Sequence, residues 1–114
     1  METIKPVTAE DILNFNDQKT VEITVPAWGN LRIKLKSLSA LDREEVIKAS
    51  KKQDGELDTA IFNAMLIIKC CVEPKFNVQQ CQALAQKNSG VLSEIAVEIN
   101  KLSEVEPLKV LKKN

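Results

Sequence analysis

Residues 57–72 read LDTAIFNAMLIIKCCV and predict a helix that is apolar around nearly its whole circumference. One stripe follows the three-and-four spacing of an amphipathic helix and must face a core. Its members are Leu57, Ala60, Ile61, Ala64, Met65, Ile68, Cys71 and Val72. The other side is apolar too, through Phe62, Leu66, Ile67 and Cys70. A helix of this kind is normally covered on more than one side, so we expect the cover to come from this fold or from another subunit.

The same stretch does not favour a membrane span. Its uninterrupted apolar run is shorter than the roughly 20 residues needed to cross a bilayer, and Lys69 lies inside it. The opening residues METIKPVTAEDI contain no apolar core of the length found in signal peptides. We therefore expect an unprocessed cytoplasmic chain that does not bind membranes.

Composition narrows the class of partner. A chain of 114 residues is one domain by the usual prior. Its 16 basic and 16 acidic residues cancel, so no overall field attracts nucleic acid or anionic lipid. Three Cys, two of them adjacent, favour reduced thiols in a cytosolic compartment over a disulfide scaffold.

The N-terminal part changes from a helical to a strand period. Thr8 is a good cap for a short helix over residues 9–15, whose apolar side chains we expect to dock on the core. They are Ile12, Leu13 and Phe15. Two alternating runs follow over residues 20–36 and predict an antiparallel hairpin with one buried face. Gly29 and Asn30 in its loop suit positive φ, and Glu22 is set against basic cross-strand neighbours.

Four further helices are predicted. They span residues 40–52, 57–72, 78–87 and 90–102. Ser39 with Asp42 resembles a capping box for the first, with Leu41, Val46, Ile47 and Ala49 as its packing side. Pro74 ends the second, because the residue before a proline is kept out of the α region. Val78, Cys81, Leu84 and Ala85 point inward from the third, and Ser89 caps the fourth.

The expected fold class is α+β and mainly helical, with one N-terminal antiparallel hairpin packed on a bundle of about four helices. It forms a single domain over residues 1–103. Residues 104–114 contain Pro107 and three lysines and are expected to form a loosely held tail.

The residue types exclude most catalytic chemistry. The sequence contains no His and no Tyr, which removes the commonest general base, the commonest zinc ligand and any Ser-His or Cys-His pair. The three glycines are too scattered for a phosphate-binding loop. Adjacent Cys70 and Cys71 would point about 100° apart on a helix, so buried apolar roles fit the thiols better than a metal site. We expect no catalytic residue, no cofactor and no metal.

Trp28 stands in the predicted hairpin loop. A large apolar ring at such a place either folds back onto the core or waits for a partner. The sequence leaves both readings open.

Residues 8–38, TAEDILNFNDQKTVEITVPAWGNLRIKLKSL, resemble the opening of the small tail assembly chaperones of long-tailed bacteriophages and prophages. The shared pattern is carried by Ile12, Leu13, Asp17, Lys19, Val25, Pro26, Trp28, Gly29, Ile33, Leu35 and Leu38, followed by Arg43, Glu44 and Glu45. Later matches are Cys71-Val72, Pro74, Phe76, Leu84, Gly90-Val91-Leu92 and residues 99–103. The resemblance spans most of residues 8–103.

The resemblance implies a non-enzymatic protein that binds the tape measure protein before the tail tube polymerises, and that is absent from the finished virion. It also implies a longer product made by ribosomal frameshifting, through which the tail tube protein becomes a partner. Lys112-Lys113-Asn114 could be encoded by a slippery, A-rich heptamer. With Trp28, the outer side of the central helix, Phe62, Leu66 and Ile67, is the candidate surface for self-association or for the client.

Two rival functions stay open at this point. A structural component of the virion tail or neck would share the small α+β composition. A DNA-binding regulator would use the basic hairpin face formed by Arg32, Lys34 and Lys36, and its affinity would fall steeply with salt.

Overall fold

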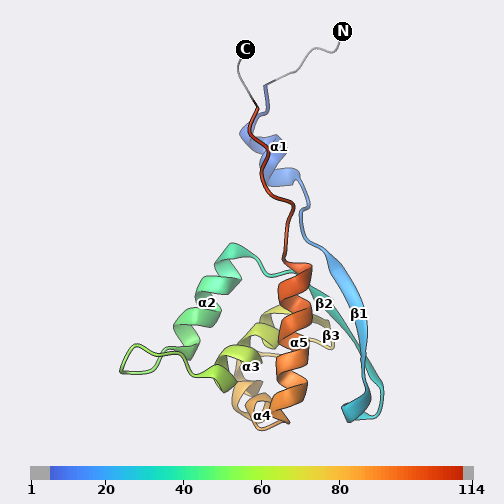
Figure 1. The fold of residues 1–114 in the computed structure, drawn as a ribbon, viewed down its shortest axis with the longest axis vertical. Coiled ribbons are helices and arrows are strands. Elements are labelled where there is room, and N and C mark those ends of the chain that lie inside the picture. Colours follow the sequence, from blue (N-terminus) through green and yellow to red (C-terminus); the bar gives the residue numbers. More distant parts are fainter. Residues whose placement is uncertain (1–5, 112–114) are drawn as a thin grey trace.

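The computed structural model describes residues 6–111, which form an α+β fold (Figure 1). Its elements are α1 (Ala9–Asn14), β1 (Thr20–Val25), a 3-10 turn (Pro26–Trp28), β2 (Leu31–Lys36), α2 (Ala40–Ser50), α3 (Thr59–Cys70), β3 (Cys71–Glu73), a second 3-10 turn (Val78–Gln80), α4 (Cys81–Ala85) and α5 (Ser89–Leu102). The fold class expected from the sequence is confirmed.

The hairpin predicted over residues 20–36 is present. β1 pairs antiparallel with β2 from Thr20 opposite Lys36 to Val25 opposite Leu31. Gly29 and Asn30 both take positive φ, at 69° and 60°. Glu22 lies opposite Lys34, and its carboxylate is 3.7 Å from the guanidinium of Arg32. The basic neighbours expected for Glu22 are therefore there.

A third strand was not expected. Within residues 6–111 the sheet order is β1-β2-β3, and β3 pairs antiparallel with β2 through Leu35 opposite Cys71. The prediction of a helix to Val72 was wrong for its last residues. Cys71 and Val72 continue the apolar period, but a period of 3.6 cannot tell a helix end from a short buried strand. Cys71 and Val72 form a strand because the free edge of β2 supplies hydrogen-bond partners that a last helical turn before Pro74 would lack.

The central helix α3 is covered by its own chain. α2, α4 and α5 all contact it, and α5 crosses over it in Figure 1. Leu66 and Ile67, expected on an outer side, are each only 1% exposed. The sequence left open whether this fold or another subunit covers the helix. For Leu66 and Ile67 the cover comes from this fold.

Smaller corrections concern helix limits. α2 ends at Ser50 rather than at residue 52. The next residue, Lys51, forms a β-bridge with Leu57, and this bridge keeps Leu57 out of α3. The helix predicted over 78–87 is a 3-10 turn followed by the short α4, and α5 is capped by Asn88 rather than Ser89.

Some side chains expected to face inward do not. Leu41 is 70% exposed and Val78 is 54% exposed, and Ala49 is also exposed. Leu41 and Ala49 lie near the two ends of α2, and Val78 is the first residue of the second 3-10 turn, which was expected to be α-helical. Val46 and Leu84 are buried as expected.

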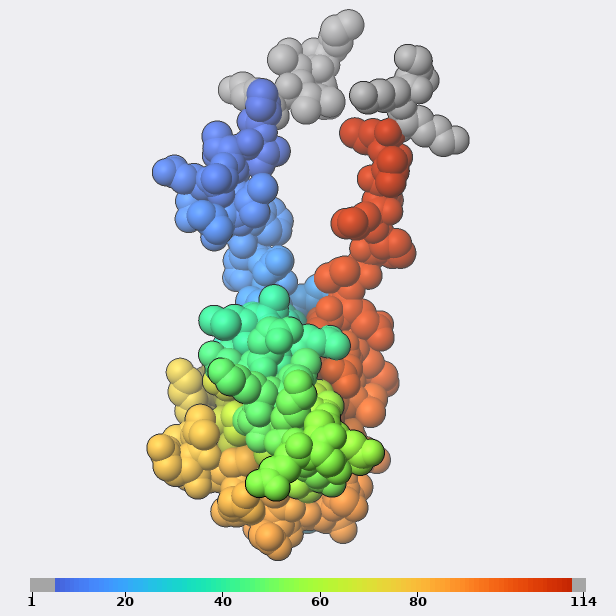
Figure 2. All heavy atoms as spheres, turned by 90° about the vertical axis from the view of Figure 1, so that its left-hand side faces the viewer, coloured from blue at the N-terminus to red at the C-terminus, as the bar shows by residue number. Residues whose placement is uncertain are grey.

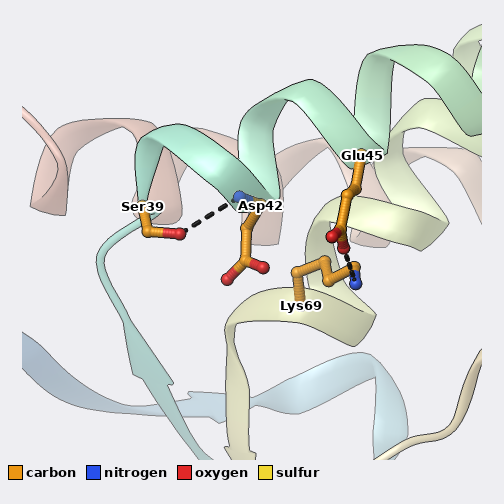
Figure 3. Close-up of polar contacts among 4 residues, drawn as sticks. All are labelled: Ser39, Asp42, Glu45 and Lys69. Atoms are coloured by element: carbon orange, nitrogen blue, oxygen red, sulfur yellow. Dashed lines mark hydrogen bonds and ion pairs between the residues drawn. The ribbon is translucent and has the colours of Figure 1, made fainter.

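Figure 3 shows one polar contact that caps α2 and another that joins α2 to α3. Ser39 caps α2, since its hydroxyl accepts a hydrogen bond of 3.1 Å from the Asp42 backbone N–H. Lys69 of α3 donates to the Glu45 carboxylate, and Asp42 lies on the same side of α2. The hydrogen bond to Glu45 is the main cause that raises the pKa of Lys69; burial opposes the rise, and the negative charges of Glu45 and Asp42 add to it.

We predict that Leu66→Ala lowers the free energy of unfolding by about 2–5 kcal/mol, because it leaves a cavity in the centre of the core. Leu41→Ala is the matched control, since it removes the same atoms from an exposed site and should change stability by about 0.5 kcal/mol or less. Urea unfolding followed by circular dichroism measures both. Equal losses in the two variants would contradict the burial of α3.

The Lys69–Glu45 pair predicts a pH dependence. Because the pKa of Lys69 is raised in the folded state, its contribution is complete below the unfolded-state pKa and is lost as the pH rises through the folded one. Glu45→Gln should therefore cost up to about 1 kcal/mol at neutral pH. The difference from the wild type should disappear at a pH above the raised pKa of Lys69. A difference that stays constant over this range in urea titrations would exclude the ion pair as its cause.

Candidate protein-binding surface

The four residues expected to bind another chain do not form one exposed surface. Leu66 and Ile67 lie inside the core. Trp28, at the end of the 3-10 turn, and Phe62, on α3, are half-buried and pack against the same core. Of the two readings of Trp28, the ring therefore folds back onto its own domain, with part of it still accessible.

Most of the large apolar side chains that stay exposed lie on two projecting segments. We call residues 7–15 the N-terminal arm and residues 105–111 the C-terminal arm. Both leave the same end of the domain, and Figure 2 shows them separated by open space. Their exposed apolar residues are Val7, Ile12, Leu13 and Phe15 on one arm, and Val105, Leu108, Val110 and Leu111 on the other.

The N-terminal arm corrects an expectation. Its helix α1 forms as predicted, because Thr8 and Asp11 make a reciprocal capping box with two hydrogen bonds of 3.1 Å. Yet Leu13 is 81% exposed and Phe15 is 75% exposed. The predicted docking of this helix onto its own core was wrong, because α1 projects beyond the end of the sheet, where no element of residues 6–111 covers it. Side chains of this size in water are typical of a surface that another molecule covers.

The bases of both arms are held by hydrogen bonds. The Ser103 hydroxyl donates to the Ile99 carbonyl at 2.8 Å and accepts from the Leu38 N–H at 2.9 Å. The Lys19 ammonium donates to the Glu104 carbonyl at 3.0 Å. These contacts tie the start of the C-terminal arm to the chain that follows the N-terminal arm, and so direct both arms to the same side.

A groove forms a second surface. It has a volume of 690 Å³ and lies between the end of β1 with the loop after it and the outer side of α5. Its lining is Ile23, Thr24, Val25, Pro26, Ala27, Val91, Ser93, Glu94, Ile95, Val97 and Glu98. In the described part of the chain β1 pairs with β2 on one side only, so the groove runs beside an open strand edge.

The sequence did not identify these surfaces. The density of apolar residues in the predicted tail was an available signal for the C-terminal arm, since four of them fall between Val105 and Leu111. The groove had no such signal, because it depends on which strand is at the sheet edge and on where α5 packs.

The thiols have the character of core residues. Burial raises the pKa of Cys70 to about 12 and that of Cys71 to about 11, so both are protonated at neutral pH. Burial also raises the pKa of Cys81, which is half-buried. Among residues 6–111 no group of three or more His, Cys, Asp or Glu is placed to hold a metal ion. A search of the same residues found no helix long and apolar enough to cross a membrane.

We predict that Cys81 reacts first with a thiol reagent at neutral pH, because it alone of the three thiols is not fully buried. Cys70 and Cys71 should react only when the protein unfolds. The rate of colour release from Ellman's reagent measures this, with Cys81→Ser as the control that removes the early phase. Rapid reaction of all three thiols in the folded protein would contradict the burial described above.

Comparison with known proteins gives one structural finding. No family model matches this sequence, and no curated protein matches it in sequence. The fold is similar to that of a solved structure of the bacteriophage HK97 tail assembly chaperone, with a TM-score of 0.64 and 14% sequence identity. The alignment covers 82% of this chain and 89% of the other. The chain therefore has the fold of that tail assembly chaperone over most of its length.

Proposed function

We propose that this chain is a non-enzymatic tail assembly chaperone of a long-tailed phage or prophage. The observation that carries this proposal is the likeness of fold to the HK97 tail assembly chaperone over 82% of the chain. The short motifs shared with the family, such as Val25-Pro26 and Trp28-Gly29, support it independently of the backbone comparison. In this role the chain acts in the host cytoplasm and leaves before the virion is complete.

We propose the tape measure protein as its client. A long helical client with unpaired apolar stripes aggregates unless those stripes are covered. The two arms offer apolar side chains that are free to cover them, such as Leu13 at 81% and Leu108 at 94% exposure. The arms thus replace Leu66 and Ile67 as the proposed client contacts, while Phe62 and Trp28 remain candidates at their accessible edges.

Two further partners belong to the same proposal. The chain associates with copies of itself, so that many small subunits cover one long client. A longer, frameshifted product carries residues that engage the tail tube protein. The codons concerned encode Lys112-Lys113-Asn114, which lie outside the described residues. Residues 104–111 lead away from the core, so an extension would continue a segment that already projects from the domain.

We predict that co-expression with the tape measure protein encoded nearby makes that protein soluble and that the two co-purify. Leu13→Asp together with Phe15→Asp should reduce the soluble client by about tenfold, because charges placed at apolar contacts are strongly unfavourable. The fraction of client in the supernatant, measured by quantitative blotting, is the readout.

Leu41→Asp is the matched control for the arm variant. It places one carboxylate, against two in the arm variant, at a site that is 70% exposed, on α2, where a carboxylate in the first helical turn is favourable. Soluble client with Leu41→Asp and insoluble client with the arm variant support the proposal. An insoluble client with the wild-type chain, together with the chain in purified particles, would instead identify a structural component of the tail or neck.

A further inference from the structure

The groove between β1 and α5 is built to take an extended apolar segment. Its walls are mainly apolar, through Ile23, Val25 and Ile95 among others, and Val97 on its α5 side is 49% exposed. Along the open edge of β1, backbone N–H and C=O groups lack strand partners in the described part of the chain. Such an edge binds an added strand through its backbone, while adjacent pockets select the side chains.

The charges of the groove select a basic occupant. Glu94 and Glu98 belong to its lining. Glu98 is 3.6 Å from Lys101 of the same helix, whereas Glu94 forms no ion pair with any residue from 6 to 111. A segment that combines apolar side chains with lysines would therefore satisfy both the walls and the rim.

Of the two arms of this chain, the C-terminal one has that composition. From Pro107 to Leu111 the sequence is PLKVL, with Lys109 and no acidic residue; Glu106 precedes this stretch, and Lys112 and Lys113 follow it in the sequence. Leu108, Val110 and Leu111 are each at least 88% exposed, and Lys109 stands among them. The N-terminal arm carries Glu10 and Asp11 and no basic residue, so its charge would be repelled by the groove.

The backbone of the C-terminal arm is also available. Residues 105–111 form no helix or strand, and none of their backbone groups is hydrogen-bonded within the described part of the chain. Pro107 precedes the basic stretch, so residues 108–111 can all donate an N–H to a neighbouring strand. The unpaired groups of the arm thus match those of the β1 edge.

The geometry favours a groove on a different molecule. The arm starts at Ser103, whose hydrogen bonds to Leu38 and Ile99 fix the end of α5, and Glu104 is held by Lys19. From there it leads away from the domain, whereas the groove lies beside the first part of α5, from Val91 to Glu98, and the hairpin loop (Figure 1). To enter its own groove the arm would have to leave these contacts and reverse direction.

We propose that the C-terminal arm of one copy docks in the β1–α5 groove of a second copy, as a strand added to the edge of β1. Leu111 inserts toward the apolar walls, and Lys109, which shares the face of Leu111 in an extended strand, lies beside Glu94 and Glu98. Because the arm and the groove are different surfaces of the same chain, the contact is heterologous and repeats from copy to copy, giving a ring or an open chain.

The inference rests on the self-association that belongs to the proposed function, and it is tested with the purified full chain and no client, so that its failure is distinguishable from a failure to bind the client. The wild type should form assemblies larger than a dimer in sedimentation velocity, over a concentration series up to about 1 mM. Val97→Asp damages the groove, and Leu111→Asp damages the arm. Each variant alone should be monomeric, with an association constant lowered by about tenfold or more.

An equal mixture of the two variants gives the decisive result. The Val97→Asp copy retains an intact arm and the Leu111→Asp copy retains an intact groove, so the mixture should form a heterodimer and no larger species. A charge reversal provides a second readout: Glu94→Lys and Lys109→Glu should each weaken assembly, and copies that carry both should regain it. Leu41→Asp, outside both surfaces, should assemble like the wild type, and circular dichroism should show all variants folded.

Several results would overturn the proposal. A wild type that is monomeric throughout the series would mean that the arm docks in its own groove or nowhere. Variants that are folded and monomeric alone but do not associate when mixed would exclude the arm-to-groove contact. If Val97→Asp assembles like the wild type but loses a co-expressed client, the groove binds the client instead; this leaves the proposed function intact.

Discussion

The burial of α3 is the constraint on which the rest of the structure depends. Its side chains are apolar on nearly every side, and Leu66, Ile67 and Cys70 are each no more than 1% exposed. One layer of neighbours cannot cover such a helix. α2, α4 and α5 therefore gather around it, and its chain runs directly into β3 at the sheet. The arrangement of the domain follows from satisfying this one element.

While α3 is covered, most of the large apolar side chains that stay exposed lie on the two arms. The arms project beyond the domain, so Phe15 and Leu111 have no element of residues 6–111 to pack against. Leaving large side chains in water forfeits roughly 1.5–3 kcal/mol for each one that could have been buried. A small domain that keeps such segments uncovered is suited to binding other chains, and this agrees with the chaperone role proposed here.

A few polar contacts decide where these segments point. Ser103 joins the end of α5 to Leu38, and Lys19 joins the chain before β1 to Glu104. Each hydrogen bond contributes on the order of 1 kcal/mol, which is little for stability. Their importance is directional, because they set the bases of both arms at the same end of the domain and leave the β1–α5 groove open. The distribution of binding surfaces thus rests on contacts that a burial pattern does not reveal.

The sequence by itself determined the fold class, the hairpin and the existence of the central helix, because each follows from local period and turn residues. The alternation in β1 and β2, the Gly29-Asn30 turn and the Thr8 cap act within a few residues of themselves. It did not determine β3 or the exposure of Ile12 and Leu13. Those depend on which surfaces meet in space: Cys71 becomes a strand because β2 has a free edge, and α1 stays uncovered because it projects past the end of the sheet. Apolar residues at a helical or strand period indicate that a surface will be covered, and only the tertiary structure decides whether the same chain covers it.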